Sequence, residues 1–133
     1  MNLFSQLPHL HTINRMVAII EPTQRFIDWV QSLPNPPQPP MTVEGMRSHS
    51  LIALIPQNDD PDEARDTLIA TQGPSIMAQA FAGWWQNDED WPDPQTAWKN
   101  FLGWFSVRIR DSVMDCGGPF QREEDITKRW AGR

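Results

Sequence analysis

The stretch that decides the fold is Arg15-Met-Val-Ala-Ile-Ile20, and a second apolar run, Ser50-Leu-Ile-Ala-Leu-Ile55, matches it. Neither run alternates between apolar and polar side chains, and a proline follows each within two residues. A short apolar run without alternation is typical of a strand that is covered on both faces. The sequence therefore predicts two buried strands, near residues 15–20 and 51–55.

A third strand is predicted near residues 107–114, where the pattern changes. From Val107 to Val113 the side chains alternate between apolar and polar, which is the period of a half-exposed strand. Arg108 and Arg110 fall on the outward face, and such charges discourage pairing between exposed strand edges. This segment is therefore expected at the edge of the sheet.

Four amphipathic stretches predict helices, and three of them begin at a residue that caps helix N-termini. The hydroxyl of Thr23 suits the first start, while Asp60-Pro61 and Asp93-Pro94 each combine a capping carboxylate with a proline at the first helical position. Gly73-Pro74 is interpreted as a break between two helices. The predicted helices lie near residues 23–33, 61–71, 75–86 and 94–105.

These elements predict an α+β or small α/β domain, in which about four helices pack on a three-stranded mixed sheet. The strand–helix–strand order at the start favours a right-handed crossover between parallel strands. The five prolines of residues 34–40 are interpreted as a stiff surface loop, because too few residues precede them for a separate domain. We predict one domain over residues 1–133, with an ordered core at 13–116 and a flexible tail at 117–133.

Seven tryptophans and six phenylalanines, with no tyrosine, indicate that aromatic rings fill the core. Helical periodicity places Trp84 and Trp98 on buried faces. It leaves Trp85 and the loop residue Trp91 exposed, where they could form a platform for a sugar, a base or a peptide. For the set of tryptophans as a whole, the core interpretation is favoured.

The net charge of −6 and a pI near 4.9 argue against a nucleic-acid partner. The single cysteine, Cys116, favours a reducing compartment. No stretch resembles a signal peptide or a membrane span, since the longest apolar runs have five residues. The sequence therefore predicts a cytoplasmic location and no membrane partner.

No catalytic or cofactor-binding signature accompanies these elements. His9 and His11 could reach one metal ion from the same strand face, but no second pair of ligands is evident. Cys116 has no identifiable base, and the acidic loop 88–93 lacks the ligand spacing of a calcium site. We predict no metal and no cofactor, and we assign no catalytic residue. Whether the two histidines or the acidic loop bind a metal stays open.

Between residues 16 and 115, the chain resembles small bacterial proteins of unknown function. The resemblance implies a bacterial, cytoplasmic protein and supplies no activity or site residue. Its motifs are aromatic residues, strand ends and helix stops. They are Phe26-Ile-Asp-Trp29, Leu54-Ile-Pro56, Trp91-Pro92, Phe101-Leu-Gly-Trp-Phe105 and Asp111-Ser-Val-Met-Asp115.

For function, we predict a small acidic domain that binds another protein or a second copy of itself. A non-enzymatic role is favoured over an enzymatic one. An edge strand offers unpaired backbone groups and an exposed tryptophan offers apolar area, so the predicted binding residues are Trp85, Trp91, Arg108 and Arg110. The alternative is a small enzyme or ligand-binding protein with a pocket of tryptophans and carboxylates around residues 84–98.

Overall fold

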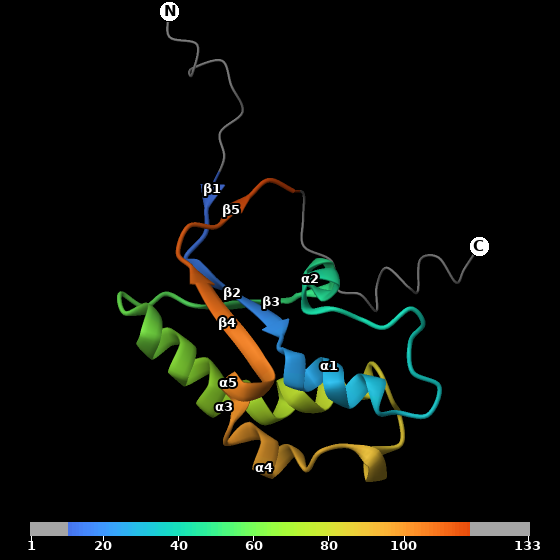
Figure 1. The fold of residues 1–133 in the computed structure, drawn as a ribbon. Coiled ribbons are helices and arrows are strands. Elements are labelled where there is room, and N and C mark those ends of the chain that lie inside the picture. Colours follow the sequence, from blue (N-terminus) through green and yellow to red (C-terminus); the bar gives the residue numbers. More distant parts are fainter. Residues whose placement is uncertain (1–10, 118–133) are drawn as a thin grey trace, which may run out of the picture. The chain divides into compact units, whose positions relative to one another are not determined.

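The computed structural model describes residues 11–117, which belong to two compact units (Figure 1). The larger unit comprises residues 14–113. In the described part of the other, β1 (His11–Thr12) pairs antiparallel with β5 (Met114–Asp115). The predicted core at 13–116 is therefore divided between the two units, and the predicted tail lies outside the described residues from position 118 onward.

The larger unit is built on a three-stranded antiparallel sheet in the order β3-β2-β4. Its strands are β2 (Arg15–Pro22), β3 (Leu51–Pro56) and β4 (Phe105–Arg110). In the register of the sheet, Ala18 at the centre of β2 lies opposite Ala53 on one side and Ile109 on the other. The predicted α+β class is confirmed, and the strands predicted at 15–20 and 51–55 are present. The third strand, predicted at 107–114, lies at 105–110 instead, because the chain leaves the sheet after Arg110.

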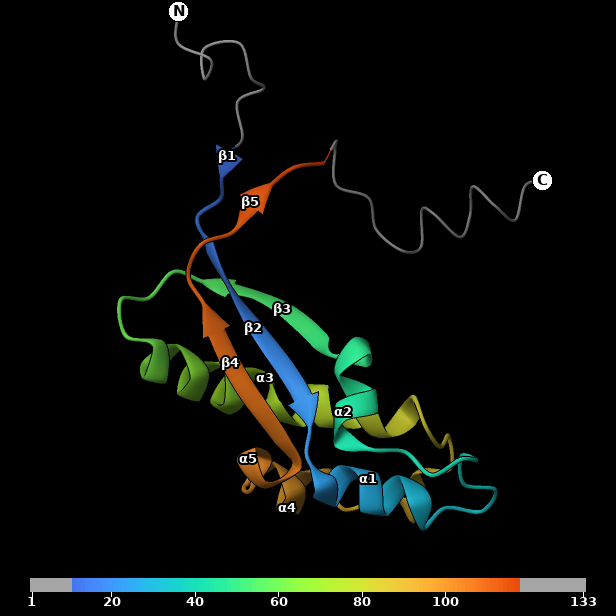
Figure 2. The same cartoon turned by 45° about the horizontal axis from the view of Figure 1, so that its top comes forward.

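The prediction of a mixed sheet with a parallel crossover is wrong, because β2 and β3 run antiparallel. The helix between them, α1 (Gln24–Gln31), has only eight residues and lies beyond the end of β2 instead of running back along the sheet (Figure 2). The proline segment 34–40 and α2 (Val43–Met46) then keep the chain at that same end. A strand that starts where the previous one stopped must run in the opposite direction.

The helices cover one face of the sheet, and the strands alternate accordingly. Met16, Ala18 and Ile20 of β2 are buried against the helices, which defines the inner face of the sheet. On the outer face, Ile52 and Leu54 of β3 are 62% and 58% exposed. The prediction of a strand at 51–55 covered on both faces is therefore wrong. Within residues 14–113, no element covers the apolar side chains of Ile52 and Leu54 on this outer face.

One continuous helix, α3 (Pro61–Ala82), passes through Gly73-Pro74, so the predicted break between two helices is wrong. Its start follows the prediction: the Asp60 carboxylate accepts hydrogen bonds from the backbone N–H groups of Asp62 at 3.0 Å and Glu63 at 3.3 Å. No helix in residues 11–117 is both long and apolar enough to cross a membrane.

The predicted helix 94–105 is divided in two. Asp93 caps α4 (Pro94–Trp98) by accepting from the backbone N–H of Gln95, as expected. The chain then leaves helical geometry at Asn100, resumes it in α5 (Phe101–Trp104), and enters β4 at Phe105. The interruption shifts the helical phase, so Leu102 is 48% exposed while its neighbours Phe101 and Trp104 are buried.

Thr23 joins the start of α1 to the end of α5 instead of capping its own helix. Its hydroxyl donates to the carbonyl oxygen of Gly103 at 2.6 Å, with the Trp104 carbonyl 3.0 Å away. Its backbone N–H also donates to the Trp104 carbonyl at 3.0 Å. The predicted capping bond within α1 is absent from the described structure, because the hydroxyl is used between helices.

The core beneath the sheet is an aromatic cluster, in agreement with the core interpretation of the sequence. Phe81 of α3 lies at its centre and is fully buried. The Phe26 ring stacks on Phe81 with centroids 5.9 Å apart, and Trp104 meets Phe81 edge-on at 5.6 Å. Rings from α1, α3, α5 and β4 therefore hold these elements together: Phe26, Trp29, Phe81, Trp104 and Phe105.

Candidate functional site

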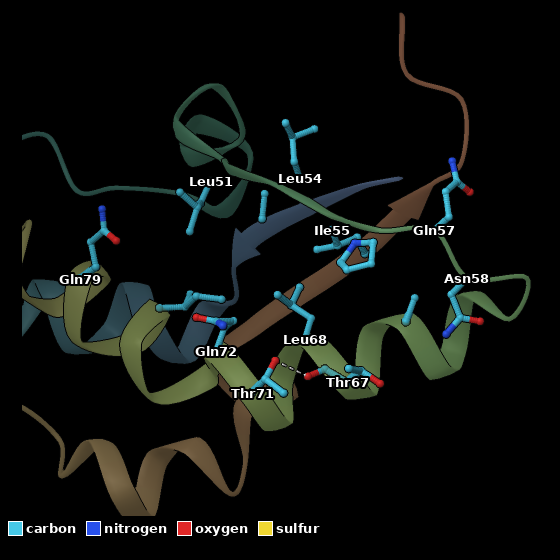
Figure 3. Close-up of a pocket in the computed structure, with 14 residues that line it drawn as sticks. Leu51, Leu54, Ile55, Gln57, Asn58, Thr67, Leu68, Thr71, Gln72 and Gln79 are labelled. Atoms are coloured by element: carbon cyan, nitrogen blue, oxygen red, sulfur yellow. Dashed lines mark hydrogen bonds between the residues drawn. The ribbon is translucent and has the colours of Figure 1, made fainter. Parts of the chain in front are cut away.

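A groove of about 690 Å³ lies between β3 and α3, and we call it the β3–α3 groove (Figure 3). Figure 3 shows Leu68 pointing from the helix toward Ile55 of the strand, while Leu54 points away from the helix. Fourteen residues line the groove: Leu51, Ala53, Leu54, Ile55, Pro56, Gln57, Asn58, Ala64, Thr67, Leu68, Thr71, Gln72, Ile76 and Gln79.

The floor and the rim of the groove come from two different periodicities. Along α3, Ala64 and Leu68 are four residues apart, share one helix face, and are buried under the strand. Along β3, alternate residues such as Ala53 and Ile55 point to the inner face and meet that helix face. The Thr71 hydroxyl on the rim donates to the Thr67 carbonyl at 2.7 Å, so it is already satisfied.

The groove contains no charged side chain, although the chain carries a net charge of −6. Its polar lining groups are the amides of Gln57, Asn58, Gln72 and Gln79 and two threonine hydroxyls. These groups can form hydrogen bonds with an occupant, but none is a carboxylate, imidazole, amine or thiol suited to general acid–base or nucleophilic chemistry at neutral pH. The lining is therefore suited to binding an uncharged, largely apolar occupant.

One wall of the groove is an open strand edge. β3 is the outermost strand of its sheet, so the backbone N–H and C=O groups on its side away from β2 have no strand partner within residues 11–117. Natural monomers often protect such an edge with charges, a bulge or proline. In β3 the only such residue is Pro56, at its end. The edge is therefore open to a further strand.

The predicted site residues Arg108 and Arg110 lie on the outer face of β4, which is an edge strand as expected. Arg108 is already engaged: its guanidinium forms a close ion pair with Glu21, a buried carboxylate on β2. Arg47 reaches the other oxygen of Glu21 at 3.8 Å from the short 3₁₀ turn Arg47–His49. These charges join β2, β4 and the turn, away from the β3–α3 groove.

The other two predicted site residues, Trp85 and Trp91, lie together beyond the end of α3. The Trp91 indole donates to the Trp85 carbonyl at 2.5 Å, and the Trp85 indole donates to the Asp90 carboxylate at 2.9 Å. Trp91 also packs on the core residue Phe81, with ring centroids 6.2 Å apart. Both rings are half-buried, and their contacts hold the chain in place after the end of α3.

Trp84 is 38% exposed, so its predicted burial is wrong. The helical wheel does not apply to it because α3 ends at Ala82. A shallow hollow of about 420 Å³ lies beside Trp84 and Trp85, but its lining, residues 82–87, includes no carboxylate. The structure therefore does not assemble the expected tryptophan and carboxylate pocket at this hollow.

The structure does not bring the candidate metal ligands together within the described residues. His9 lies outside the described residues, and residues 11–117 contain no group of three or more His, Cys, Asp or Glu side chains placed to hold a metal ion. The acidic loop includes a 3₁₀ turn, Asp88–Asp90, whose start is capped by the Asn87 side chain. Cys116 follows β5 and is exposed.

Sequence reasoning missed the β3–α3 groove because it treated residues 51–55 as buried on both faces. A signal was present in the helix, where Thr67-Leu-Ile-Ala-Thr-Gln72 is uncharged for six residues although the helix begins with a run of acids. An uncharged helix face next to an uncharged strand indicates a surface built for contact rather than for solvent.

Comparison of the chain with protein-family models, with curated proteins and with solved structures finds no match in any of the three.

Proposed function

We propose that this chain is a non-enzymatic binding domain that receives an extended, uncharged segment of protein in the β3–α3 groove. The observation that carries the proposal is the combination of an open strand edge with an uncharged apolar groove beside it. An extended segment aligned with β3 satisfies the free backbone groups of the strand. Its alternate side chains then point into the groove, as in other complexes formed by strand addition.

The exposed apolar side chains beside the groove support this mode of binding. Leu51, Ile52 and Leu54 are all exposed: Ile52 and Leu54 lie on the outer face of β3, and Leu51 lies on its inner face at the groove. Apolar surface of this kind, concentrated on an unprotected edge, favours association over solvation. We place the domain in the cytoplasm of a bacterial cell, on the basis of its single cysteine and of the resemblance described above.

A photocrosslinking residue at Thr67 tests the proposal, because Thr67 is exposed and lines the groove. The matched control is Asp66, the adjacent residue on the same helix, which lines a separate hollow beside Trp98. After irradiation in cells, we expect the Thr67 probe to attach to an uncharged apolar segment of a protein chain, identified by mass spectrometry.

The Asp66 probe should give no comparable adduct. If the Thr67 probe captures no protein segment, or if both probes capture the same proteins equally, the groove is not a protein-binding site. Adducts to small molecules in place of peptides would instead favour a ligand-binding role and would contradict the proposal.

A further inference from the structure

We propose that the segment received by β3 is the β3 strand of a second copy of this chain, paired antiparallel with the first. This inference rests on the proposed function and identifies its partner. Two three-stranded sheets would then join into one continuous sheet across a two-fold axis, with both open β3 edges closed by one contact.

The composition of β3 is the first argument, because the strand matches the requirements of its own groove. Leu51-Ile-Ala-Leu-Ile-Pro56 has no charge and no polar side chain. The groove beside it requires an uncharged, apolar occupant. Each copy therefore offers the surface and the occupant together, which is the self-complementarity that a two-fold interface needs.

The register of such a pairing also fits the two faces of the sheet. When the two-fold axis passes at Ala53, Ile52 of one copy lies opposite Leu54 of the other, and both belong to the exposed outer face. On the inner face, Leu51 lies opposite Ile55 of the second copy, at the mouth of the groove. Apolar side chains thus meet apolar side chains on both faces of the joined sheet.

The charges that flank β3 are the second argument, because they select the antiparallel direction. The turn Arg47–His49 ends one residue before β3 and carries Arg47 and His49. After β3 and two neutral residues come four acidic ones, Asp59, Asp60, Asp62 and Glu63. Antiparallel pairing brings the start of one strand beside the end of the other, so basic ends meet acidic ends twice. Parallel pairing would place like charges together at both ends.

Arg47 is able to take part in this contact. Its guanidinium is 3.8 Å from Glu21, yet its side chain remains 66% exposed. Asp59 is also exposed, and within the described residues it is not an N-cap, since Asp60 has that role at the start of α3. The two charges can therefore approach each other between copies without dismantling the capping contacts of either copy.

The other edge strand of the sheet, β4, differs from β3 in the charge of its side chains. The opposite edge of the sheet, β4, presents Arg108 and Arg110 on its outer face, and such charges oppose a stacked or extended sheet. The same sheet thus has one protected edge and one apolar edge. This asymmetry limits assembly to a closed dimer instead of an open fibre, because β4 cannot continue the pairing.

Light scattering after size-exclusion chromatography tests the inference on the intact chain. We expect the mass of a dimer, twice the 15.3 kDa of the chain, over a range of protein concentrations. Replacing Leu54→Lys at its exposed position should place lysines against the second copy and raise the dimer Kd at least about tenfold. The matched control, Leu102→Lys, changes an exposed leucine on α5 and should leave the mass unchanged.

A disulfide tests the register without relying on a charged variant. In a Cys116→Ser background, Ala53→Cys places one thiol of each copy opposite the other at the two-fold axis, and mild oxidation should give a covalent dimer. Ala70→Cys, at an exposed position on α3, should not crosslink. Asp59→Lys should raise the dimer Kd about two- to fivefold, and adding Arg47→Asp should lower it again.

A monomer at every concentration would overturn the inference, and so would a dimer that Leu54→Lys leaves intact or that Ala53→Cys does not crosslink. The proposed function fails separately. A monomeric chain whose Thr67 probe still captures a segment of another protein would retain the function and lose only the second copy as partner. A chain that does neither would contradict both.

Discussion

The indole ring of Trp98 lies directly on Gly73, so closely that a Cβ atom at position 73 would stand 2.3 Å from the Trp98 Cδ1 atom. From this position the indole N–H donates to the carbonyl oxygen of Ile69 at 2.7 Å. The contact fixes α4 on α3 one residue before Pro74. Gly73 has no side chain to keep the ring away, and the carbonyl oxygen of Ile69 has a second lone pair with which it can accept the indole N–H.

Gly73→Ala should therefore destabilise the fold even though alanine is the better helix former. The added methyl group displaces the Trp98 ring, and we expect a net loss of about 1–2 kcal/mol in the free energy of unfolding. Gly83→Ala is the control, because its Cβ would meet no atom closer than 3.5 Å and the backbone φ is −63°. Urea denaturation should show Gly83→Ala as neutral or slightly stabilising. Equal losses of unfolding free energy in both variants would show that the Trp98 ring moves aside without cost.

The tryptophans should rank by how much each contributes to the core. Trp98→Ala removes a ring that packs against the core and bonds α3, and should cost about 3–5 kcal/mol. Trp91→Ala loses the contact with Phe81 and should cost less, while Trp85→Ala should cost least because its indole bonds only a surface carboxylate. Thermal melting of the three variants gives the ranking. A Trp85→Ala variant that melts as early as Trp98→Ala would contradict it.

Glu21 should be the most sensitive charge in the described sheet. Glu21→Gln leaves Arg108 and Arg47 without their shared carboxylate and should cost about 1.5–3 kcal/mol. Because Arg47 is largely exposed, its share of the loss should shrink in about 1 M salt. The control Asp28→Asn, at an exposed position on α1, should change stability by less than about 0.5 kcal/mol. The measurement is the unfolding free energy at low and high salt.

The hydroxyl of Thr23 should matter more than its methyl group. Thr23→Val removes the donor to the Gly103 carbonyl and should cost about 1 kcal/mol, whereas Thr23→Ser should keep most of the stability. Thr71→Val offers a comparison, since that hydroxyl bonds within one exposed helix turn. If Thr23→Val and Thr71→Val lose equal stability, then the bond between α1 and α5 does not hold the helices together.

Much of the fold could be predicted because local signals agreed with the tertiary structure. The Asp60-Pro61 and Asp93-Pro94 starts appear as expected, and the apolar runs become β2 and β3. The run of 51–55 resembled a doubly covered strand because an uncovered apolar face looks the same in sequence as a buried one. Only the placement of the helices on one face distinguishes them.

The helix through Pro74 could not be predicted from the sequence around it. Gly73-Pro74 ordinarily ends a helix, since it removes a backbone donor and adds flexibility. Here Trp98, 25 positions further along the chain from Gly73, occupies the space that the glycine leaves. The groove depended on this same helix, because Thr67 and Ile76 share its wall only when α3 is continuous. The continuity of α3, and with it the groove, therefore depends on a long-range contact that the local sequence does not reveal.

Because β2 is the central strand, its two edges can be paired only at different times during synthesis. The ion pair between Glu21 and Arg108 can form only after the ribosome has added a further 87 residues, and until then β4 cannot pair with β2. At about 5–20 residues per second, the ribosome takes roughly 4–17 s to make that stretch. During this interval β2 can pair with β3, but its other edge stays available to chaperones and to neighbouring nascent chains. The last strand of this sheet to emerge, β4, is therefore the one that closes the second edge of β2.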